Sequence, residues 1–460
     1  MNAWFPRVTA HSLVVVISIL IYVLTTRVEH ERRPPSIAIA WVLGMIAVPY
    51  LVLPAYLMFG RRKLPRKVLR SSGVYAHGMH WAEDLIESFG LPPCAPAAVR
   101  LHQDGDESAA ALFAIMSGAR QRLDICTYIL GNDAFGRSAM LCMMQCAQRG
   151  VQVRLLIDGV GAVQLPRRYF RQMKDAGVET AIFSPLFARK TQGPRNLRNH
   201  RKMAIADGTQ LWAGGRNIAA EYFTGLKGAR PWRDLSFDLR GAVASAAAAQ
   251  FEDDWVAAGG RPVTLAAPQD PQDPAVMVGG SDAGRAQFLP SGPDQAEDTV
   301  HALLIDACFH VRERMLAVTP YFVPDAALET AMRLAARRGV KIDLCIPAVS
   351  NHRLADFVRH RALRSLSNAG VNIHLLPHMN HAKAVVFDQS LAISGSVNLD
   401  SRSLLLNYEC AVVFYGAREI DWLSRWILAL IPEATPFDCR APGLLRDIGE
   451  GLLLTVAYQL

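Results

Sequence analysis

The chain has 460 residues, which is too long for one ordinary domain and predicts two or three folded units. Apolar residues make up 51% of it and charged residues 20%, as in a globular protein that carries a membrane-embedded part. The net charge is +8, but six basic residues crowd into 61–70 and the rest is nearly neutral, which argues against a nucleic-acid partner with its need for a wide basic surface.

Two apolar segments fill most of the first sixty residues. Residues 12–25 approach a spanning length, and residues 36–60 carry no charge and exceed the ~20 residues that a bilayer-spanning helix needs. Pro49 and Pro54 are expected to kink the second segment. No small-residue cleavage site follows the first segment, so we interpret it as a retained helix rather than a signal peptide, with a re-entrant hairpin as the alternative. Residues 1–70 are thus predicted to form two transmembrane helices and a basic juxtamembrane segment.

The flanking charges predict the orientation of this hairpin. Three arginines lie between the two apolar segments, whereas six Lys or Arg residues follow the second one within 61–70. The positive-inside rule places that side, and the large C-terminal part with it, in the cytoplasm. The same cluster is expected to contact anionic lipid headgroups. Residues 71–95 are expected to form a connector to the globular part.

Beyond residue 95 the sequence alternates strand patterns with helical patterns, and it does so twice. In the first half, strand-like residues 122–130 and 150–158 flank a helical stretch. In the second half the order recurs as a strand over 314–324, a helix over 328–339 and a strand over 339–347. This order predicts an α/β fold with helices covering a sheet. The expected units are a first lobe over 96–260, a linker rich in Pro and Gly over 261–285, and a second lobe over 286–460.

One motif occurs in both halves, as "NHRKMAIADGTQLWAGGRN" (199–217) and "NHAKAVVFDQSLAISGSVN" (380–398). With 13 histidines in the chain and Lys and Asp each at roughly 5% of residues, only about 0.03 chance matches to His-x-Lys-x4-Asp are expected. The motif is therefore an internal duplication. The matching pairs are His200 and His381, Lys202 and Lys383, Asp207 and Asp388, Gly214 and Gly395, Gly215 and Ser396, and Asn217 and Asn398.

Each copy of the motif reads as a hairpin of two strands. Residues two apart in a strand share a face, so each histidine is expected to project beside its lysine. Asp207 and Asp388 fit the turns, although they also belong to the candidate catalytic set. Gly214 and Gly395 fit positions where two backbones approach closely. Asn217 and Asn398 would return to the histidines. They are expected to complete a phosphate-binding set that also includes Gly214, Gly215, Gly395 and Ser396.

Two such sets facing each other could transfer a phosphoryl-type group. One neutral histidine would attack phosphorus, and the other, protonated, would deliver a proton to the leaving oxygen. The lysines and asparagines would stabilise the developing charge. Acidic partners would fix the second ring nitrogen of each histidine, and Asp234 and Glu409 are the candidates. None of the 8 cysteines shows a metal-ligand spacing with histidine, so neither a metal nor another cofactor is expected.

Two further stretches, 188–202 and 351–364, are rich in Lys and Arg and lie just before the two motifs. They could be solvated loops. Their position beside the predicted site favours capture of anionic headgroups.

The duplicated His-x-Lys-x4-Asp with its downstream Gly-(Ser/Gly)-x-Asn resembles the signature of the phospholipase D superfamily. More closely, the chain resembles the bacterial cardiolipin synthases of the phospholipase D type. The residues that carry this likeness, besides the two N-terminal spans, are "FEDDW" (251–255), "SGPD" (291–294), "TPYFVPD" (319–325) and "GSVNLDSRSLLLNYE" (395–409).

The resemblance implies a two-lobed, pseudo-twofold fold of mixed sheets flanked by helices, preceded by a transmembrane helical hairpin in the bacterial inner membrane. It also implies that His200 is the nucleophile, that His381 is the acid and base, and that two phosphatidylglycerols yield cardiolipin and glycerol through a phosphatidyl-histidine. The "GGRN" at 214–217 and the C-terminal "GLLLTVAYQL" depart from this subfamily, so phosphatidylethanolamine stays open as the second lipid. The alternatives are a hydrolytic phospholipase D, a membrane-tethered phosphodiesterase or nuclease, and a scaffold without activity.

Overall fold

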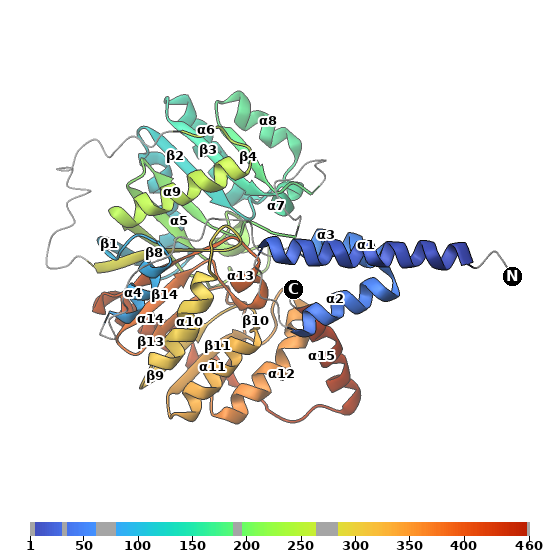
Figure 1. The fold of residues 1–460 in the computed structure, drawn as a ribbon. Helices are drawn as coiled ribbons and strands as arrows, with labels where there is room; N and C mark the ends of the chain where they lie inside the picture. The colour runs from blue at the N-terminus through green and yellow to red at the C-terminus, as the bar shows by residue number, and fades with distance from the viewer. Residues whose placement is uncertain (1–4, 30–34, 61–79, 187–195, 264–283, 458–460) are drawn as a thin grey trace.

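The computed structural model describes residues 5–29, 35–60, 80–186, 196–263 and 284–457 (Figure 1). The predicted basic segment at 61–70 lies outside the described residues, as do most of the linker and part of the 188–202 stretch.

Three helices form the N-terminal part: α1 (Phe5–Glu29), α2 (Pro35–Ala47) and α3 (Pro49–Phe59). The second apolar segment is broken at Val48 because the residue before a proline is disfavoured in the helical conformation, and Pro49 then begins α3. Tyr22 and Tyr56 are buried between the helices, and the Tyr56 hydroxyl lies 2.6 Å from Thr25 Oγ1. The three helices project from one side of the globular body (Figure 1).

Within the described part of the chain, no helix combines the length and the apolar content that crossing a membrane requires. The predicted pair of spanning helices is therefore not confirmed. The expected kink at Pro49 is instead a division into two helices.

Among the described residues, one mixed sheet of fifteen strands forms the centre of the globular body. The strands of the first half, in spatial order, are β1 (Ala95–His102), β7 (Ser236–Arg240), β6 (Gln210–Gly214), β5 (Met203–Ala206), β2 (Arg122–Thr127), β3 (Gln152–Asp158) and β4 (Glu179–Phe183). Those of the second half are β8 (Gly284–Ser291), β16 (Glu409–Phe414), β14 (Leu391–Gly395), β13 (Ala384–Phe387), β9 (Arg314–Val318), β11 (Lys341–Pro347), β12 (Asn372–Leu376) and β17 (Thr435–Pro436). The halves join where β1 and β8 pair antiparallel.

The two halves repeat one topology. In each half, two parallel strands (β2 and β3, or β9 and β11) lie beside the antiparallel hairpin that follows the duplicated histidine. The predicted strands at 122–130, 150–158 and 339–347 and the helix at 328–339 are confirmed, whereas 314–324 holds β9 and a separate short strand, β10 (Phe322–Val323), paired with β15 (Leu399–Asp400). β8 begins at Gly284, inside the predicted linker.

Helices cover both faces of the sheet and enclose three large apolar cores. One core is shared by both halves and includes Phe237 of β7, Phe414 of β16 and Leu423 of α14, which makes the two halves one packed body. The first half contributes α5 (Gly105–Gly118), α6 (Ala134–Gln148), α7 (Gly159–Gln164), α8 (Arg167–Asp175), η1 (Ala220–Tyr222) and α9 (Ala242–Ala257). The second half contributes α10 (Thr299–His310), α11 (Ala326–Arg337), α12 (Arg353–Ala369), α13 (Ser401–Leu405), α14 (Ala417–Leu428), η2 (Ile431–Glu433) and α15 (Leu444–Ala457), while α4 (Trp81–Ser88) precedes β1.

Candidate active site

The two motif hairpins are anchored by their aspartates. Asp207 and Asp388 sit in the turns of β5–β6 and β13–β14 with positive φ values of 53° and 49°. Asp207 accepts hydrogen bonds from the backbone N–H groups of residues 120–122, and Asp388 accepts them from those of residues 312–314. These contacts tie each hairpin to the start of β2 or β9, at the end of the hairpin away from the histidine. The structure does not bring the two carboxylates to the catalytic centre.

The His-x-Lys segments lie just before the strands and not within them. β5 begins at Met203 and β13 at Ala384, so the predicted placement of these residues within a strand is wrong, although Lys383 does lie beside the His381 ring. Each lysine instead turns back: Lys202 Nζ donates to the carbonyl of His200 at 2.7 Å, and Lys383 Nζ donates to that of His381 at 2.5 Å.

Each histidine segment leaves its own ladder because it pairs with the other half of the molecule. The His200 N–H donates to the carbonyl of Tyr408 at 2.8 Å, and the His381 N–H donates to that of Arg233 at 2.6 Å. Tyr408 directly precedes β16, and Arg233 lies shortly before β7. The two histidines are therefore placed by the contact between the lobes as much as by their own hairpins.

The side chains cross between the lobes in the same way. His200 Nδ1 lies 2.9 Å and 3.1 Å from the two carboxylate oxygens of Glu409, and His381 Nδ1 lies 2.7 Å from Asp234 Oδ2. Both carboxylates are buried. The two acids named from the sequence thus contact the two histidines, each from the opposite lobe. A carboxylate that accepts the Nδ1 proton leaves the Nε2 lone pair for chemistry.

Ser396 and its counterpart Gly215 differ because each lies beside a different acid, Glu409 or Asp234. Ser396 Oγ donates to Glu409 Oε2 at 2.5 Å, which fixes the longer side chain. A Cβ at Gly215 would collide with the Asp234 carboxylate, so glycine leaves room for the shorter one. Ser396 and Gly215 therefore position the carboxylates of Glu409 and Asp234 rather than line a phosphate-binding site. At the preceding positions, a Cβ on Gly214 or Gly395 would strike the backbone of the next strand, as expected from their close approach.

The asparagines hold loops and make no hydrogen bond to either histidine in the described structure. Asn217 accepts from the N–H of Ile129 at 3.2 Å and donates to the Tyr222 hydroxyl at 2.8 Å. Asn398 donates to Ser403 Oγ at 3.1 Å, in α13. The expected amide donors beside the imidazoles are thus replaced by supports for Tyr222 and for the start of α13.

Aromatic rings enclose the imidazoles, and the two surroundings differ. Tyr128 meets His200 edge-on with 5.1 Å between ring centroids. The ring of His381 instead has three aromatic neighbours at 5.1 to 6.3 Å: Tyr222, Trp232 and Tyr321. The His200 side chain is 13% exposed and that of His381 only 4%.

Burial governs the charges of the site. It lowers the pKa of both histidines, and in His381 the nearby Lys383 ammonium helps to lower it to about 3. Burial also lowers the pKa of Lys202 to about 8 and of Lys383 to about 7. Burial disfavours the charged carboxylates of Asp234 and Glu409, yet the adjacent lysines and histidines hold both pKa values below their ordinary range. Both imidazoles are therefore neutral at neutral pH in the free protein.

The reactive nitrogens are also inequivalent. Lys383 Nζ lies 2.7 Å from His381 Nδ1 and 3.0 Å from its Nε2. Within the described ranges, no polar contact is found for His200 Nε2. The two rings therefore differ, since the Lys383 amine lies beside both nitrogens of His381, whereas the described contacts of the His200 ring nitrogens are those of Nδ1 with Glu409.

Arg201 is a site residue that the sequence analysis missed. Its Nε donates to the carbonyl of Glu409 at 2.9 Å, and its guanidinium pairs with Asp254 and, at 2.9 Å, with Asp294. It is fully buried and joins the lobes directly beside His200. Two features of the sequence could have pointed to Arg201. Its counterpart in the second motif is Ala382, so the repeat is broken at this position, and its acidic partners lie in the quoted "FEDDW" and "SGPD" stretches.

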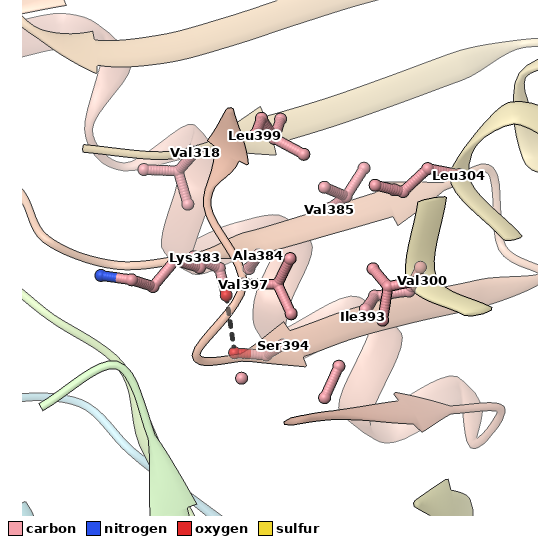
Figure 2. Close-up of a pocket in the computed structure, with 12 residues that line it drawn as sticks. Val300, Leu304, Val318, Lys383, Ala384, Val385, Ile393, Ser394, Val397 and Leu399 are labelled. Atoms are coloured by element: carbon pink, nitrogen blue, oxygen red, sulfur yellow. Dashed lines mark hydrogen bonds between the residues drawn. The ribbon is translucent and has the colours of Figure 1, made fainter. Parts of the chain in front are cut away.

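An apolar pocket that Lys383 borders lies between α10 and the β13–β14 hairpin (Figure 2). Val300, Leu304, Val385 and Ile393 line it, and the Lys383 amine extends away from them. Neither imidazole lines this pocket, so it belongs to the core of the second lobe. In the parts of the chain that the structure describes, no group of three or more His, Cys, Asp or Glu side chains is arranged to hold a metal ion.

The chain is similar to known proteins over most of its length. Residues 112–255 and 304–431 match the family described as "Cardiolipin synthase, PLD-like domain", and residues 13–61 match the family described as "Phospholipase_D-nuclease N-terminal". The chain is 30% identical over 466 residues to cardiolipin synthase A of Pseudomonas aeruginosa (strain LESB58), covering 95% of this chain and 93% of that protein. It is also 30% identical to cardiolipin synthase A of Pseudomonas putida (strain W619), covering 90% of each.

A solved structure shares the fold at low sequence identity. The phosphatidylserine synthase of Haemophilus influenzae Rd KW20 aligns with a TM-score of 0.61 and 13% identity, over 83% of this chain and 98% of that one.

Proposed function

The chain belongs to the cardiolipin synthase family of the phospholipase D superfamily, and we propose that it transfers a phosphatidyl group from one phosphatidylglycerol to another, releasing glycerol. The observation that carries the proposal is the crossed arrangement of two buried histidine and carboxylate pairs, each with its own lysine. This arrangement offers one nucleophile, one proton carrier and positive charge for a phosphodiester.

We assign the nucleophile to His200 because its Nε2 has no recorded polar contact in the described structure and its side chain is the more exposed. Nε2 attacks phosphorus, the bond from phosphorus to the glycerol oxygen breaks, and a phosphatidyl-histidine forms. The Glu409 carboxylate holds the Nδ1 proton and stabilises the positive imidazole ring.

His381 then carries the protons. Its pKa is low in the free site, but the entering phosphodiester anion favours the protonated form and offsets the effect of Lys383. The imidazolium gives its Nε2 proton to the departing glycerol oxygen. In the second half, His381 accepts the hydroxyl proton of the next phosphatidylglycerol, whose oxygen attacks phosphorus and breaks the bond to His200. Lys202 and Lys383 balance the charge on the phosphoryl oxygens.

We further propose that the N-terminal helices attach the protein to the bacterial inner membrane, with the catalytic body on the cytoplasmic side. Large apolar side chains on these helices are exposed, among them Leu13, Leu20 and Leu51 at 61%, 54% and 72%. A lipid environment would cover such a surface. We also propose a division into two lobes, the first over 96–260 as expected from the sequence and the second beginning with β8 at Gly284 instead of at 286.

The test is to follow products from labelled phosphatidylglycerol in mixed micelles with a chelator present. We expect cardiolipin and glycerol from the wild type and neither from His200→Ala or His381→Ala. Phosphatidic acid as the only phospholipid product would show that the same site hydrolyses phosphatidylglycerol instead of making cardiolipin. Cardiolipin formed only when phosphatidylethanolamine is added would change the second substrate.

A further inference from the structure

Two exposed valines occupy matching places in the two lobes. Val163 lies in α7, which follows β3, and Val349 lies in the loop that follows β11. β3 is parallel to β2, and β11 is parallel to β9, so both valines leave the sheet at the edge where the two histidines enter it. Their exposed fractions are 59% and 72%.

The Val163 segment is packed against the part of the site that surrounds His200. A Cβ at Gly161 would collide with the carbonyl of Tyr128, so α7 lies directly on that backbone. The Tyr128 ring in turn contacts His200. Asp158, which caps α7 through the N–H of Val160 at 2.8 Å, also accepts the N–H of Asn199 at 2.9 Å.

The Val349 segment is tied to the second half-site. Asn351, two residues further on, accepts a hydrogen bond of 2.5 Å from the Tyr321 hydroxyl, and the Tyr321 ring lies edge-on to that of His381 at 6.3 Å between centroids. A third exposed aliphatic side chain, Leu226 at 51%, lies in the loop that carries Trp232, another neighbour of His381. Val163, Leu226 and Val349 thus lie on segments that contact the aromatic neighbours of the two histidine rings.

Basic side chains prevail in the segments that carry these three residues, although acids border the segments and Glu433 pairs with Arg233. Residues 159–172, 222–233 and 344–355 contain no Asp or Glu. They carry Arg167, Arg168, Arg171, Lys227, Arg230, Arg233 and Arg353.

Single exposed aliphatic residues are common on proteins, and the position of these three is what sets them apart. Leu334 also stands among basic residues, but it lies near the C-terminal end of α11, which leads to the start of β11 and so to the edge of the sheet away from the histidines. Val256 follows Asp253 and Asp254, and Phe309 follows Asp306 by three residues. Aliphatic side chains among basic residues are typical of surfaces that enter the headgroup layer of an anionic bilayer.

We propose that Val163, Leu226 and Val349, with the basic residues of their segments, form a rim that docks the mouth of the active site on a bilayer of anionic phospholipids. The rim holds both half-sites at headgroup depth, so that a phosphodiester can reach His200 without leaving the bilayer. This inference rests on the proposed function for the identity of the lipid. In Figure 1, α7 lies on the side of the first lobe toward which α1–α3 project.

Depth-dependent quenching tests the docking without reference to activity. An environment-sensitive fluorophore is attached to a cysteine at position 163 or 349 of the full chain, with Cys94, Cys142 and Cys439 replaced by serine because they are the cysteines that are not buried. Position 334 on α11 is the control, since Leu334 is also exposed, at 46%. In vesicles that contain phosphatidylglycerol, a lipid-borne quencher should dim the labels at 163 and 349 and spare the one at 334. Equal quenching at all three positions, or quenching at none, would overturn the proposal.

Turnover supplies the second readout. In the double variant Val163→Asp and Val349→Asp, the ratio of turnover on phosphatidylglycerol vesicles to turnover on monomeric short-chain phosphatidylglycerol should fall about tenfold, because two apolar contacts are lost and two repulsive charges gained. Leu334→Asp should leave the ratio unchanged. An unchanged ratio in the double variant refutes the rim. A wild type that forms no cardiolipin from either substrate refutes the proposed function, and the quenching result still decides the docking.

Discussion

Glu409 Oε1 of the second lobe lies 2.9 Å from Nδ1 of His200 in the first lobe. Asp234 and His381 repeat this relationship in the opposite direction at 2.7 Å. Neither motif histidine is paired with a carboxylate of its own lobe, so the duplicated halves are two parts of one site.

Replacing Glu409 by Gln should lower the transfer rate by ~100-fold or more, because the amide no longer stabilises the positive His200 ring or fixes its tautomer. The measurement is kcat for cardiolipin formation, with circular dichroism to verify folding. Ser396→Ala, which removes one hydrogen bond to Glu409, should cause a smaller loss. Near-wild-type turnover in Glu409→Gln would refute the role of this carboxylate.

Acid should destabilise the wild type more than His381→Gln. The pKa of His381 is about 3 in the folded protein against an ordinary value of 6.5, so between these values the unfolded chain binds more protons than the folded chain. Stability therefore rises with pH in this window, and this contribution is lost as the pH falls from 6.5 toward 3. The readout is the difference in melting temperature between wild type and variant across that range. A difference that does not change with pH would contradict the buried, neutral imidazole.

Loss of Arg201 should destabilise the contact between the lobes. Arg201→Met leaves Asp254 buried without its cation, which costs about 3 to 5 kcal/mol. Arg233→Ala is the matched control, since it breaks a cross-lobe ion pair with Glu433 in which both side chains are 44% exposed, worth at most about 1 kcal/mol. Chemical denaturation of both variants gives the comparison. Equal, small effects would show that Arg201 does not join the lobes.

Gly215→Ala should impair catalysis more than folding. The new Cβ would collide with the Asp234 carboxylate and displace it from His381. We expect a loss in kcat of about tenfold or more, in line with a disturbed orienting carboxylate. Gly118→Ala is the control, because nothing lies within 4 Å of a Cβ built there at the end of α5. Full activity in Gly215→Ala would mean that Asp234 can shift without consequence.

The sequence could identify the two histidines and their acids because the duplication supplies two independent copies of one pattern. Asp207 and Asp388 could also be placed in turns, since the motif reads as strand, turn and strand. Their hydrogen bonds to the starts of β2 and β9 could not be predicted, because these strands lie more than 70 residues away.

The pairing of each motif histidine with the opposite lobe could not be predicted from the sequence either. It depends on how β1 and β8 dock and on Arg201, whose counterpart Ala382 leaves no trace of a partner in the motif. The asparagines and Ser396 were interpreted as phosphate ligands because the sequence gives their spacing from the histidine but not the direction of their side chains. In the structure, Ser396 faces Glu409, and Asn217 faces Tyr222.

The central claim is that His200 forms a covalent bond to phosphorus. Rapid mixing with labelled phosphatidylglycerol, a denaturing quench at neutral to alkaline pH and peptide mass spectrometry would locate that bond. We predict a phosphatidyl adduct on the peptide that contains His200, and none in His200→Ala. An adduct on His381, or turnover that proceeds with no adduct on either histidine, would contradict the account.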